Sequence, residues 1–226
     1  MGRTGQGNNV VELTLIRHGQ AQTGAKDEAS YDSLSDLGHQ QARWLGEVLR
    51  EGQPFDQVIS GVMTRQIETV ESMALAGVPH NTDARLNELD YFGLAESLRA
   101  SDGVAIPGDI QSFALHVPQL LDVWRNGNVD GGLETYDEFC SRIMGALHNA
   151  AGQDGRIVLV TSTGVIATLA AIALGLDMVK KTKLFLKVMN TSVHKFELVG
   201  GDLHLTQFGA IPHLEQPNRT HARTYG

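Results

Sequence analysis

A buried strand that stops abruptly at a polar tripeptide constrains this chain most. Residues 10 to 16 form an apolar, partly β-branched run, which predicts a strand in the interior of a sheet. Arg17, His18 and Gly19 follow at the expected carboxyl end of that strand. Ligands of open α/β sheets bind just beyond the carboxyl ends of strands. The tripeptide is therefore a candidate binding or catalytic site.

The residue types of the tripeptide suit a phosphate ester. The guanidinium of Arg17 offers a planar fork of donors for phosphate oxygens. The neutral imidazole of His18 can act as a nucleophile and form a covalent intermediate. Gly19 lets the backbone turn without a side chain that crowds the ligand. Taken alone, three residues match by chance so often that a polar surface loop is the better interpretation, and the rest of the chain must decide.

Length and composition favour one globular domain. The chain has 226 residues, of which 42% are hydrophobic and 19% charged. Residues 1–9 are polar and glycine-rich, so we expect a flexible lead-in without the apolar core of a signal peptide, followed by one domain over residues 10–226. No apolar run approaches the length that spans a membrane.

Charge and cysteine content exclude several kinds of partner and site. The net charge of −8 argues against non-specific binding to nucleic acid or to an anionic membrane surface, so we expect neither partner. Cys140 is the only cysteine, which excludes an intrachain disulfide and a cysteine-based zinc site. Its isolation also fits a cytoplasmic location, where thiols stay reduced.

Strand and helix patterns alternate along the chain and predict an α/β fold. We expect a single-domain, three-layer α/β/α sandwich around a mostly parallel sheet. Residues 95–130 are the hardest to assign, and we interpret them as an excursion over the active site. Strands are expected at 55–59, 80–86, 156–161, 184–189, 192–199 and 203–206, and helices at 36–50, 64–77, 110–124 (kinked or split at Pro118), 136–151 and 165–174.

Further candidate residues lie on the predicted loops and helix starts. Arg65 falls in the first turn of a helix that follows a strand, where free amides and the helix dipole favour anions, although for this residue taken alone a surface ion pair is the better interpretation. Glu88 and Asp90 are either solvated charges on a loop, or one of them is a proton donor. The polar loop over residues 20–32 is expected to pass over the site, with Thr23 as a substrate contact.

Five sequence blocks in this order resemble the histidine phosphatase superfamily, also called phosphoglycerate mutase-like. The resemblance covers most of residues 11–207. The blocks are LIRHG at 15–19, LSDLG at 34–38, SGVMTRQIET at 60–69, LNE at 86–88 with a glycine downstream, and GLET at 132–135. Five blocks in the right order are far more specific than any one of them.

The resemblance implies a role for each site residue. His18 would be the nucleophile that takes the phosphoryl group, and Arg17 and Arg65 would clamp its oxygens. Glu88 would donate a proton to the leaving alcohol and then take one from the attacking water. Neither a metal nor another cofactor would be needed. The resemblance also implies that Gly19, Thr23, Thr163 and Gly164 contact the substrate.

The chain departs from the family at the second histidine. The family usually shows S/T-H-G after the strand at 157–160, whereas this sequence has Ser162-Thr163-Gly164. Threonine can donate one neutral hydrogen bond, and loss of one preorganised donor typically costs about 10²–10³ in rate. The sequence places none of His39, His80 and His194 in the site, and each is interpreted as a surface or structural histidine.

Three functions remain open at this point. The first is a phosphatase that acts through a phosphohistidine on a small phosphorylated metabolite or a phosphoprotein. The second is a degenerate member that binds a phosphorylated ligand without turnover. A phosphoglycerate mutase ranks last, because Arg99 and Arg125 are the only lysines or arginines in residues 95–130. A homodimer is compatible with the sequence, but packing against the sheet already explains the apolar helix at 165–174.

Overall fold

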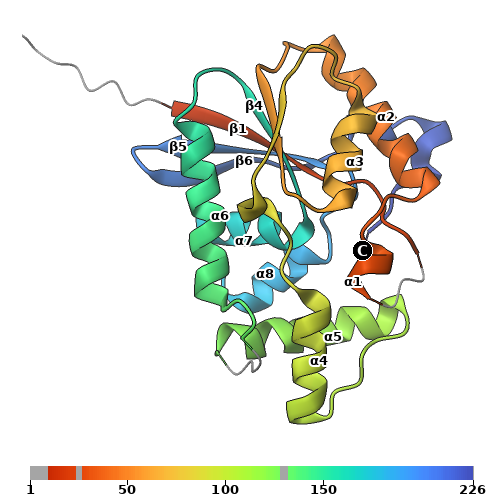
Figure 1. Ribbon diagram of the computed structural model, residues 1–226, viewed down its shortest axis with the longest axis vertical. Coiled ribbons are helices and arrows are strands. Elements are labelled where there is room, and N and C mark those ends of the chain that lie inside the picture. The colour runs from red at the N-terminus through yellow and green to blue at the C-terminus, as the bar shows by residue number, and fades with distance from the viewer. Residues whose placement is uncertain (1–9, 24–26, 128–131, 226) are drawn as a thin grey trace, which may run out of the picture.

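The computed structural model describes residues 10–23, 27–127 and 132–225 and shows a single α/β domain (Figure 1). The lead-in predicted for residues 1–9 lies outside the described residues. The described strands form one sheet in the order β3-β2-β4-β1-β5-β6. The first four are parallel, whereas β5 pairs antiparallel with β1 and β6 antiparallel with β5. The strands are β1 (Val10–Arg17), β2 (Gln57–Ser60), β3 (His80–Thr82), β4 (Ile157–Thr161), β5 (Val193–Val199) and β6 (Asp202–Ala210).

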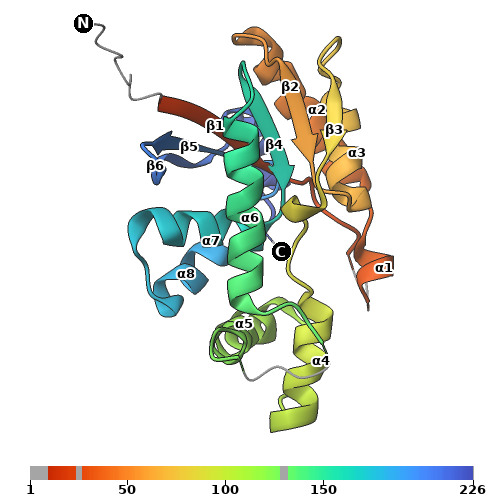
Figure 2. The ribbon, with the colours of Figure 1, turned by 60° about the vertical axis from the view of Figure 1, so that its left-hand side comes forward.

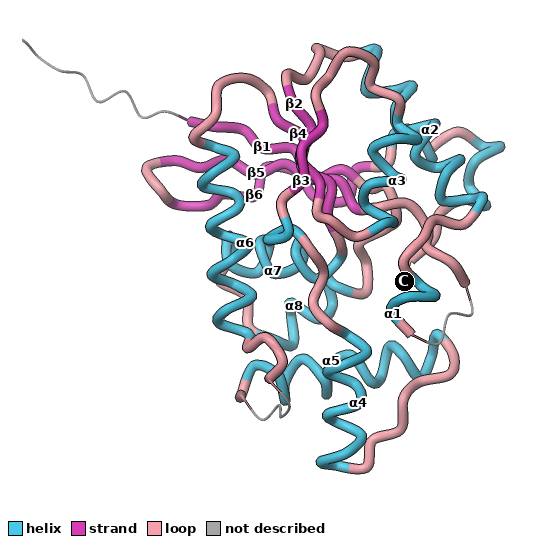
Figure 3. Tube along the Cα trace, viewed as in Figure 1, coloured by secondary structure: helices cyan, strands magenta, loops and turns pink. Residues whose placement is uncertain are grey.

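Helices cover both faces of the sheet, which confirms the predicted three layers (Figure 3). On one face, Ile16 and Val160 of the strands pack with Leu45 and Met73 of two helices, α2 and α3. On the other face, a larger apolar cluster joins the strands to α6 and α7. The helices are α1 (Glu28–Tyr31), α2 (Asp36–Glu51), α3 (Thr64–Met73), α4 (Tyr91–Asp102), α5 (Ile110–Arg125), α6 (Tyr136–Ala151), α7 (Thr163–Leu174) and α8 (Met178–Phe185), with short 3₁₀ helices η1 (Ala84–Leu86), η2 (Pro212–Leu214) and η3 (Pro217–Ala222).

Local capping residues fix several element boundaries where the sequence predicts them. The Ser35 side chain accepts a hydrogen bond from the Gly38 amide and starts α2. Thr135 and Glu138 form the predicted capping box at the start of α6. Gly200 and Gly201 both adopt positive φ, 60° and 96°, as the tight hairpin between β5 and β6 requires. These predictions are confirmed.

The strand predicted at 184–189 is wrong, because this stretch contains the end of helix α8 and a turn. Asp177 caps α8 by accepting from the Lys180 amide at 2.9 Å. Leu184, Leu186 and Val188 alternate in the sequence like strand residues. Leu184 nevertheless lies in α8, which begins at Met178, and Leu186 and Val188 lie in the turn that follows. The strand predicted at 80–86 is also shortened, since η1 follows β3.

The stretch interpreted as an excursion, residues 95–130, holds most of helix α4 and all of helix α5. Figure 2 shows them beyond the end of the sheet towards which the arrowhead of β4 points. Pro118 lies within α5, which is one helix and not two. Across the described residues, no helix combines the length and the apolar character needed to cross a membrane.

Candidate functional site

Three neighbouring strand ends bring the candidate residues together. Arg17 ends β1 and pairs with Thr161 at the end of the parallel strand β4. The chain continues from β1 into His18, from β4 into Thr163 at the start of α7, and from β2 into α3 with Arg65. The prediction that His18 and Thr163 follow neighbouring parallel strands is confirmed.

The His18 ring is held in one tautomer. Its Nδ1 lies 2.7 Å from the Gly19 carbonyl oxygen. A carbonyl oxygen can only accept, so Nδ1 carries the proton and Nε2 keeps its lone pair. Burial, together with the charges of Arg65 and Arg17, holds the pKa of His18 well below its ordinary value. The ring is therefore neutral near pH 7 and has a nucleophilic nitrogen.

Two glycines allow the loop that carries His18 to pack against α2. A Cβ on Gly19 would lie 2.6 Å from the Gly38 carbonyl oxygen, and a Cβ on Gly38 would lie 2.1 Å from the Gln20 carbonyl oxygen. Neither position has room for a side chain against these backbone atoms. Gly19 is thus required by the backbone of α2, a reason that the tripeptide alone could not supply.

The Arg17 guanidinium is buried beside the same loop. It donates to the Val188 carbonyl at 2.5 Å and to the Tyr31 hydroxyl, and its Nε has no hydrogen-bond partner among the described residues. A buried donor without a partner is costly and would be satisfied by a ligand oxygen.

The turn over residues 188–192 supports the loop that carries His18 and was missed by the sequence analysis. The Asn190 side chain donates to the His18 carbonyl at 3.2 Å, and the Thr191 amide donates to the Arg17 carbonyl at 3.1 Å. Thr191 has a positive φ of 58°, which is rare for a β-branched residue. Asn190 and Thr191 fall between the strands predicted at 184–189 and 192–199, and nothing in the local sequence marks their contacts with residues 17 and 18.

Arg65 is buried, with 1% of its surface exposed, so the interpretation as a surface ion pair is wrong. Its Nη1 lies 3.0 Å from Oδ1 of Asp32, and the other oxygen of Asp32 accepts from the Thr64 amide at 2.9 Å. The guanidinium also lies 4.9 Å from the centroid of the Tyr31 ring. Asp32 thus anchors both Arg65 and the first turn of α3.

Glu88 reaches the first turn of α7. Both carboxylate oxygens accept from the Gly164 amide, at 2.9 and 3.0 Å, and one accepts from the Leu89 amide. A Cβ on Gly164 would lie 2.2 Å from this carboxylate, which explains the glycine there. Burial raises the pKa of Glu88, outweighing the opposite effects of the amides and of the two arginines. A raised pKa suits a proton donor.

Thr163, which stands at the position of the family's second histidine, has an unpaired hydroxyl. Only 5% of the residue is exposed, and its Oγ1 has no hydrogen-bond partner among the described residues. The preceding Ser162 hydroxyl accepts from Gln66 at 2.8 Å and makes no cap bond. The start of α7 therefore presents a free hydroxyl donor beside Glu88.

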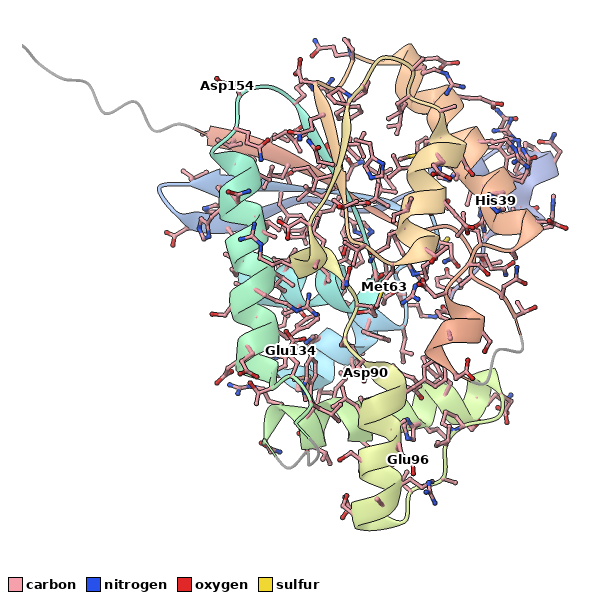
Figure 4. All side chains as sticks on the ribbon, viewed as in Figure 1. His39, Met63, Asp90, Glu96, Glu134 and Asp154 are labelled. Atoms are coloured by element: carbon pink, nitrogen blue, oxygen red, sulfur yellow. The ribbon has the colours of Figure 1, made fainter. Side chains whose placement is uncertain are left out.

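The other histidines named in the sequence analysis pair with serines of the scaffold. His39 on α2 pairs with Ser72, His80 with Ser60, and His194 with Ser192, each at 2.8 Å. Figure 4 labels His39 on α2 and Met63 just before α3. These contacts agree with the predicted structural roles.

A model of the histidine phosphatase superfamily (branch 1) matches residues 13–210. This chain belongs to the histidine phosphatase superfamily. It is 30% identical over 217 residues to phosphoglycerate mutase-like protein 4 of Arabidopsis thaliana, covering 92% of this chain and 89% of the relative. It is 29% identical over 182 residues to a glucosyl-3-phosphoglycerate phosphatase of Mycolicibacterium vanbaalenii, covering 74% and 76%.

Solved structures share the fold of this superfamily member. Bacillus stearothermophilus YhfR superposes with a TM-score of 0.67 at 21% identity, covering 90% of this chain and 99% of that one. A mycobacterial glucosyl-3-phosphoglycerate phosphatase superposes with a TM-score of 0.64 at 23% identity, covering 89% and 100%.

Arg142 on α6 positions the segment that carries Glu88 in this histidine phosphatase superfamily member, and sequence reasoning missed it. Its guanidinium donates to the carbonyl oxygens of Arg85 and Asn87, at 2.7 and 2.8 Å, and of Glu88 at 3.3 Å. Glu134, labelled near the start of α6 in Figure 4, accepts from the same guanidinium. The acid of the GLET block thus orients the arginine that holds the Glu88 segment.

Two other candidates lie apart from these contacts. Asp90 accepts from the Gly93 amide at 2.9 Å and caps α4, a structural role. Thr23 is exposed in a turn at the edge of the described residues, and its role as a substrate contact stays a prediction. No cluster of three or more metal-binding side chains occurs within the described residues.

Proposed function

We propose that this protein hydrolyses phosphomonoesters through a phosphohistidine on His18. The observation that carries the proposal is the buried neutral imidazole, with Nδ1 bound to a carbonyl and Nε2 free, beside Arg17 and Arg65. The substrate is a small phosphorylated molecule or a phosphoprotein. The phosphatase name of one relative and the mutase-like name of another agree with phosphoryl transfer.

In the first step, Nε2 of His18 attacks phosphorus and the bond to the leaving oxygen breaks. Arg17 and Arg65 balance the charge on the phosphoryl oxygens, the dominant electrostatic task in such a transfer. Glu88 gives its proton to the departing alkoxide, which leaves as an alcohol. The raised pKa of Glu88 keeps that proton available.

In the second step, a water molecule attacks the phosphohistidine. The Glu88 carboxylate formed in the first step takes the proton of this water, while the phosphorus–nitrogen bond breaks. Phosphate leaves, the His18 ring becomes neutral again, and Glu88 is reprotonated. A covalent intermediate divides one difficult displacement into two easier ones.

Thr163 favours a second candidate, a degenerate member that binds phosphorylated ligands without turnover. The missing histidine would remove one charged donor from the phosphoryl group. The hydroxyl of Thr163 is nevertheless buried and free to donate. We favour the phosphatase because loss of one donor reduces a rate, whereas the proposed nucleophile is retained.

The variant Thr163→His separates the two candidates. If the remaining site is competent, the imidazole supplies the missing donor and kcat for an aryl phosphate rises by about tenfold to a thousandfold. Thr163→Val, which removes only the hydroxyl, serves as the matched control and is expected to lower kcat. Absence of turnover in all three proteins, with phosphate binding retained in calorimetry, would favour the non-catalytic binder.

The variant Arg142→Met tests the positioning of Glu88. Displacement of a catalytic group by about 1 Å can cost about 10²-fold in rate. We therefore expect kcat for alkyl phosphates to fall by about ten- to a hundredfold, with a smaller loss for aryl phosphates, whose leaving groups need no acid.

Partial rescue by Arg142→Lys would support this role, and Arg85→Met is the control because Arg85 pairs with Asp83 near the surface. Equal slowing of alkyl and aryl phosphates in Arg142→Met would instead indicate a purely structural arginine.

A further inference from the structure

We propose that the substrate of this site has a flat apolar leaving group without a second negative charge, and that a row of aromatic residues leading from the arginines binds it. The inference rests on the proposed function, since it requires the phosphoryl group to lie at Arg17 and Arg65. We call this set of side chains the aromatic row; its members are Tyr31, Phe92, Tyr91, Phe113 and His116.

The aromatic row begins at the two arginines. The Tyr31 hydroxyl is hydrogen-bonded to Arg17, and its ring lies 4.9 Å from the Arg65 guanidinium. The first ring of the row is therefore in direct contact with both groups that would clamp the phosphoryl oxygens. A leaving group attached to that phosphoryl group starts next to Tyr31.

The row continues across α4 and onto α5 through ring contacts. The Tyr31 and Phe92 centroids lie 6.5 Å apart in an edge-to-face arrangement, and Phe92 lies 5.7 Å from Tyr91. Tyr91 lies 5.3 Å from Phe113 and 5.8 Å from His116. Tyr91 starts α4 and follows Glu88 by three residues in the sequence.

The row offers apolar surface and little polarity. Its four phenyl and phenol rings belong to half-buried residues, so each retains some exposed surface. The Tyr91 hydroxyl is 3.1 Å from Nδ1 of His116, whose Nε2 is buried without a partner among the described residues. Burial lowers the pKa of His116, so the ring is neutral at pH 7. Within the described structure, the buried polar atom of the row that lacks a hydrogen-bond partner is thus Nε2 of the neutral His116 ring.

Among the described residues, the two arginines on the helices of the row are paired with carboxylates. Arg99 on α4 pairs with Glu96, and Arg125 on α5 pairs with Asp137. Lys181 on α8 is 1% exposed, and its ammonium lies 4.4 Å from the centroid of the Tyr136 ring without a hydrogen-bond partner among the described residues. A carboxylate or second phosphate on the leaving group would therefore lose hydration at the neutral row and would find Arg99 and Arg125 already paired with carboxylates. An aromatic or aliphatic leaving group would bury apolar surface on the row.

The test compares three alkyl phosphates whose leaving alcohols have similar acidity. They are 2-phenylethyl phosphate, ethyl phosphate and 3-phosphoglycerate. We expect kcat/KM for 2-phenylethyl phosphate to exceed that for ethyl phosphate by about tenfold or more, since apolar contacts of this size discriminate by about 10–200-fold. We expect 3-phosphoglycerate to be no better than ethyl phosphate. A preference for 3-phosphoglycerate would overturn the inference and leave the proposed function intact.

Variants of Phe92 test whether the aromatic row causes the preference for 2-phenylethyl phosphate over ethyl phosphate. Phe92→Ala should reduce the ratio of kcat/KM between 2-phenylethyl and ethyl phosphate by about tenfold, and Phe92→Leu, which keeps packing volume, should reduce it less. Leu115→Ala is the control, because Leu115 on α5 is 74% exposed and outside the row. An unchanged ratio in Phe92→Ala would contradict the assignment.

Binding measurements separate this inference from the proposed function. The probes are 2-phenylethylphosphonate and ethylphosphonate, which cannot be hydrolysed, titrated by calorimetry into the unmodified protein. Tighter binding of the phenyl compound without turnover of any phosphate ester would support the row and reject the phosphatase. Equal affinity of the two phosphonates would overturn the proposal that the row binds the leaving group, whether or not the protein hydrolyses phosphate esters.

Discussion

Replacing His18 with alanine is expected to abolish hydrolysis, with a loss of at least about 10⁴-fold in kcat. The proposed chemistry needs a covalent bond from Nε2 of His18 to phosphorus, and His39, His80 and His194 are instead paired with serines. The ring makes one hydrogen bond, to the Gly19 carbonyl, so its removal should leave the fold intact.

The intermediate itself provides the sharper measurement. Incubation of the unmodified protein with a labelled phosphodonor should give an acid-labile, base-stable phosphoryl adduct that maps to His18 and is absent from His18→Ala. His39→Ala is the matched control, because it removes a histidine on α2 and should retain both adduct and turnover. Unchanged turnover in His18→Ala would reject the phosphohistidine mechanism.

The variant Glu88→Gln is expected to slow alkyl phosphates by about 10²–10⁴-fold, the range for loss of a general acid. Aryl phosphates that release an acidic phenol should lose far less, because their leaving groups depart without a proton. Glutamine keeps the shape of the side chain and one acceptor for the Gly164 amide. Equal slowing of both substrate classes would show that Glu88 only shapes the site.

The pH dependence follows from the direction of the Glu88 pKa shift. Because burial raises the pKa of Glu88, its proton persists to higher pH than that of an ordinary glutamic acid. The rate with alkyl phosphates should fall as pH rises through this pKa, whereas the low pKa of His18 keeps the nucleophile neutral on the acid side. The falling limb should be absent for Glu88→Gln and should remain in Asp90→Asn, which affects only the cap of α4.

The sequence by itself determined the elements whose signals are local. Ser35 caps α2 and Thr135 forms a box with Glu138, because each partner lies three residues away along the chain. The apolar run of β1 and the polar residues at its end likewise specify where a strand stops. Since the carboxyl ends of parallel strands share one edge of a sheet, the sequence also predicted that His18 and Thr163 would follow neighbouring strands.

Only the tertiary structure decided how the site residues are held. Val188 accepts from Arg17 across 171 positions of sequence, Gly164 donates to Glu88 across 76, and Arg142 donates to the Arg85 carbonyl across 57. Such contacts leave no periodic pattern, because they arise when the order of strands in the sheet brings distant loops to one edge. The turn after α8 was assigned to a strand because its apolar residues alternate locally. Its backbone instead contacts the end of β1, since the Val188 carbonyl accepts from Arg17 and the Thr191 amide donates to the carbonyls of Arg17 and His18.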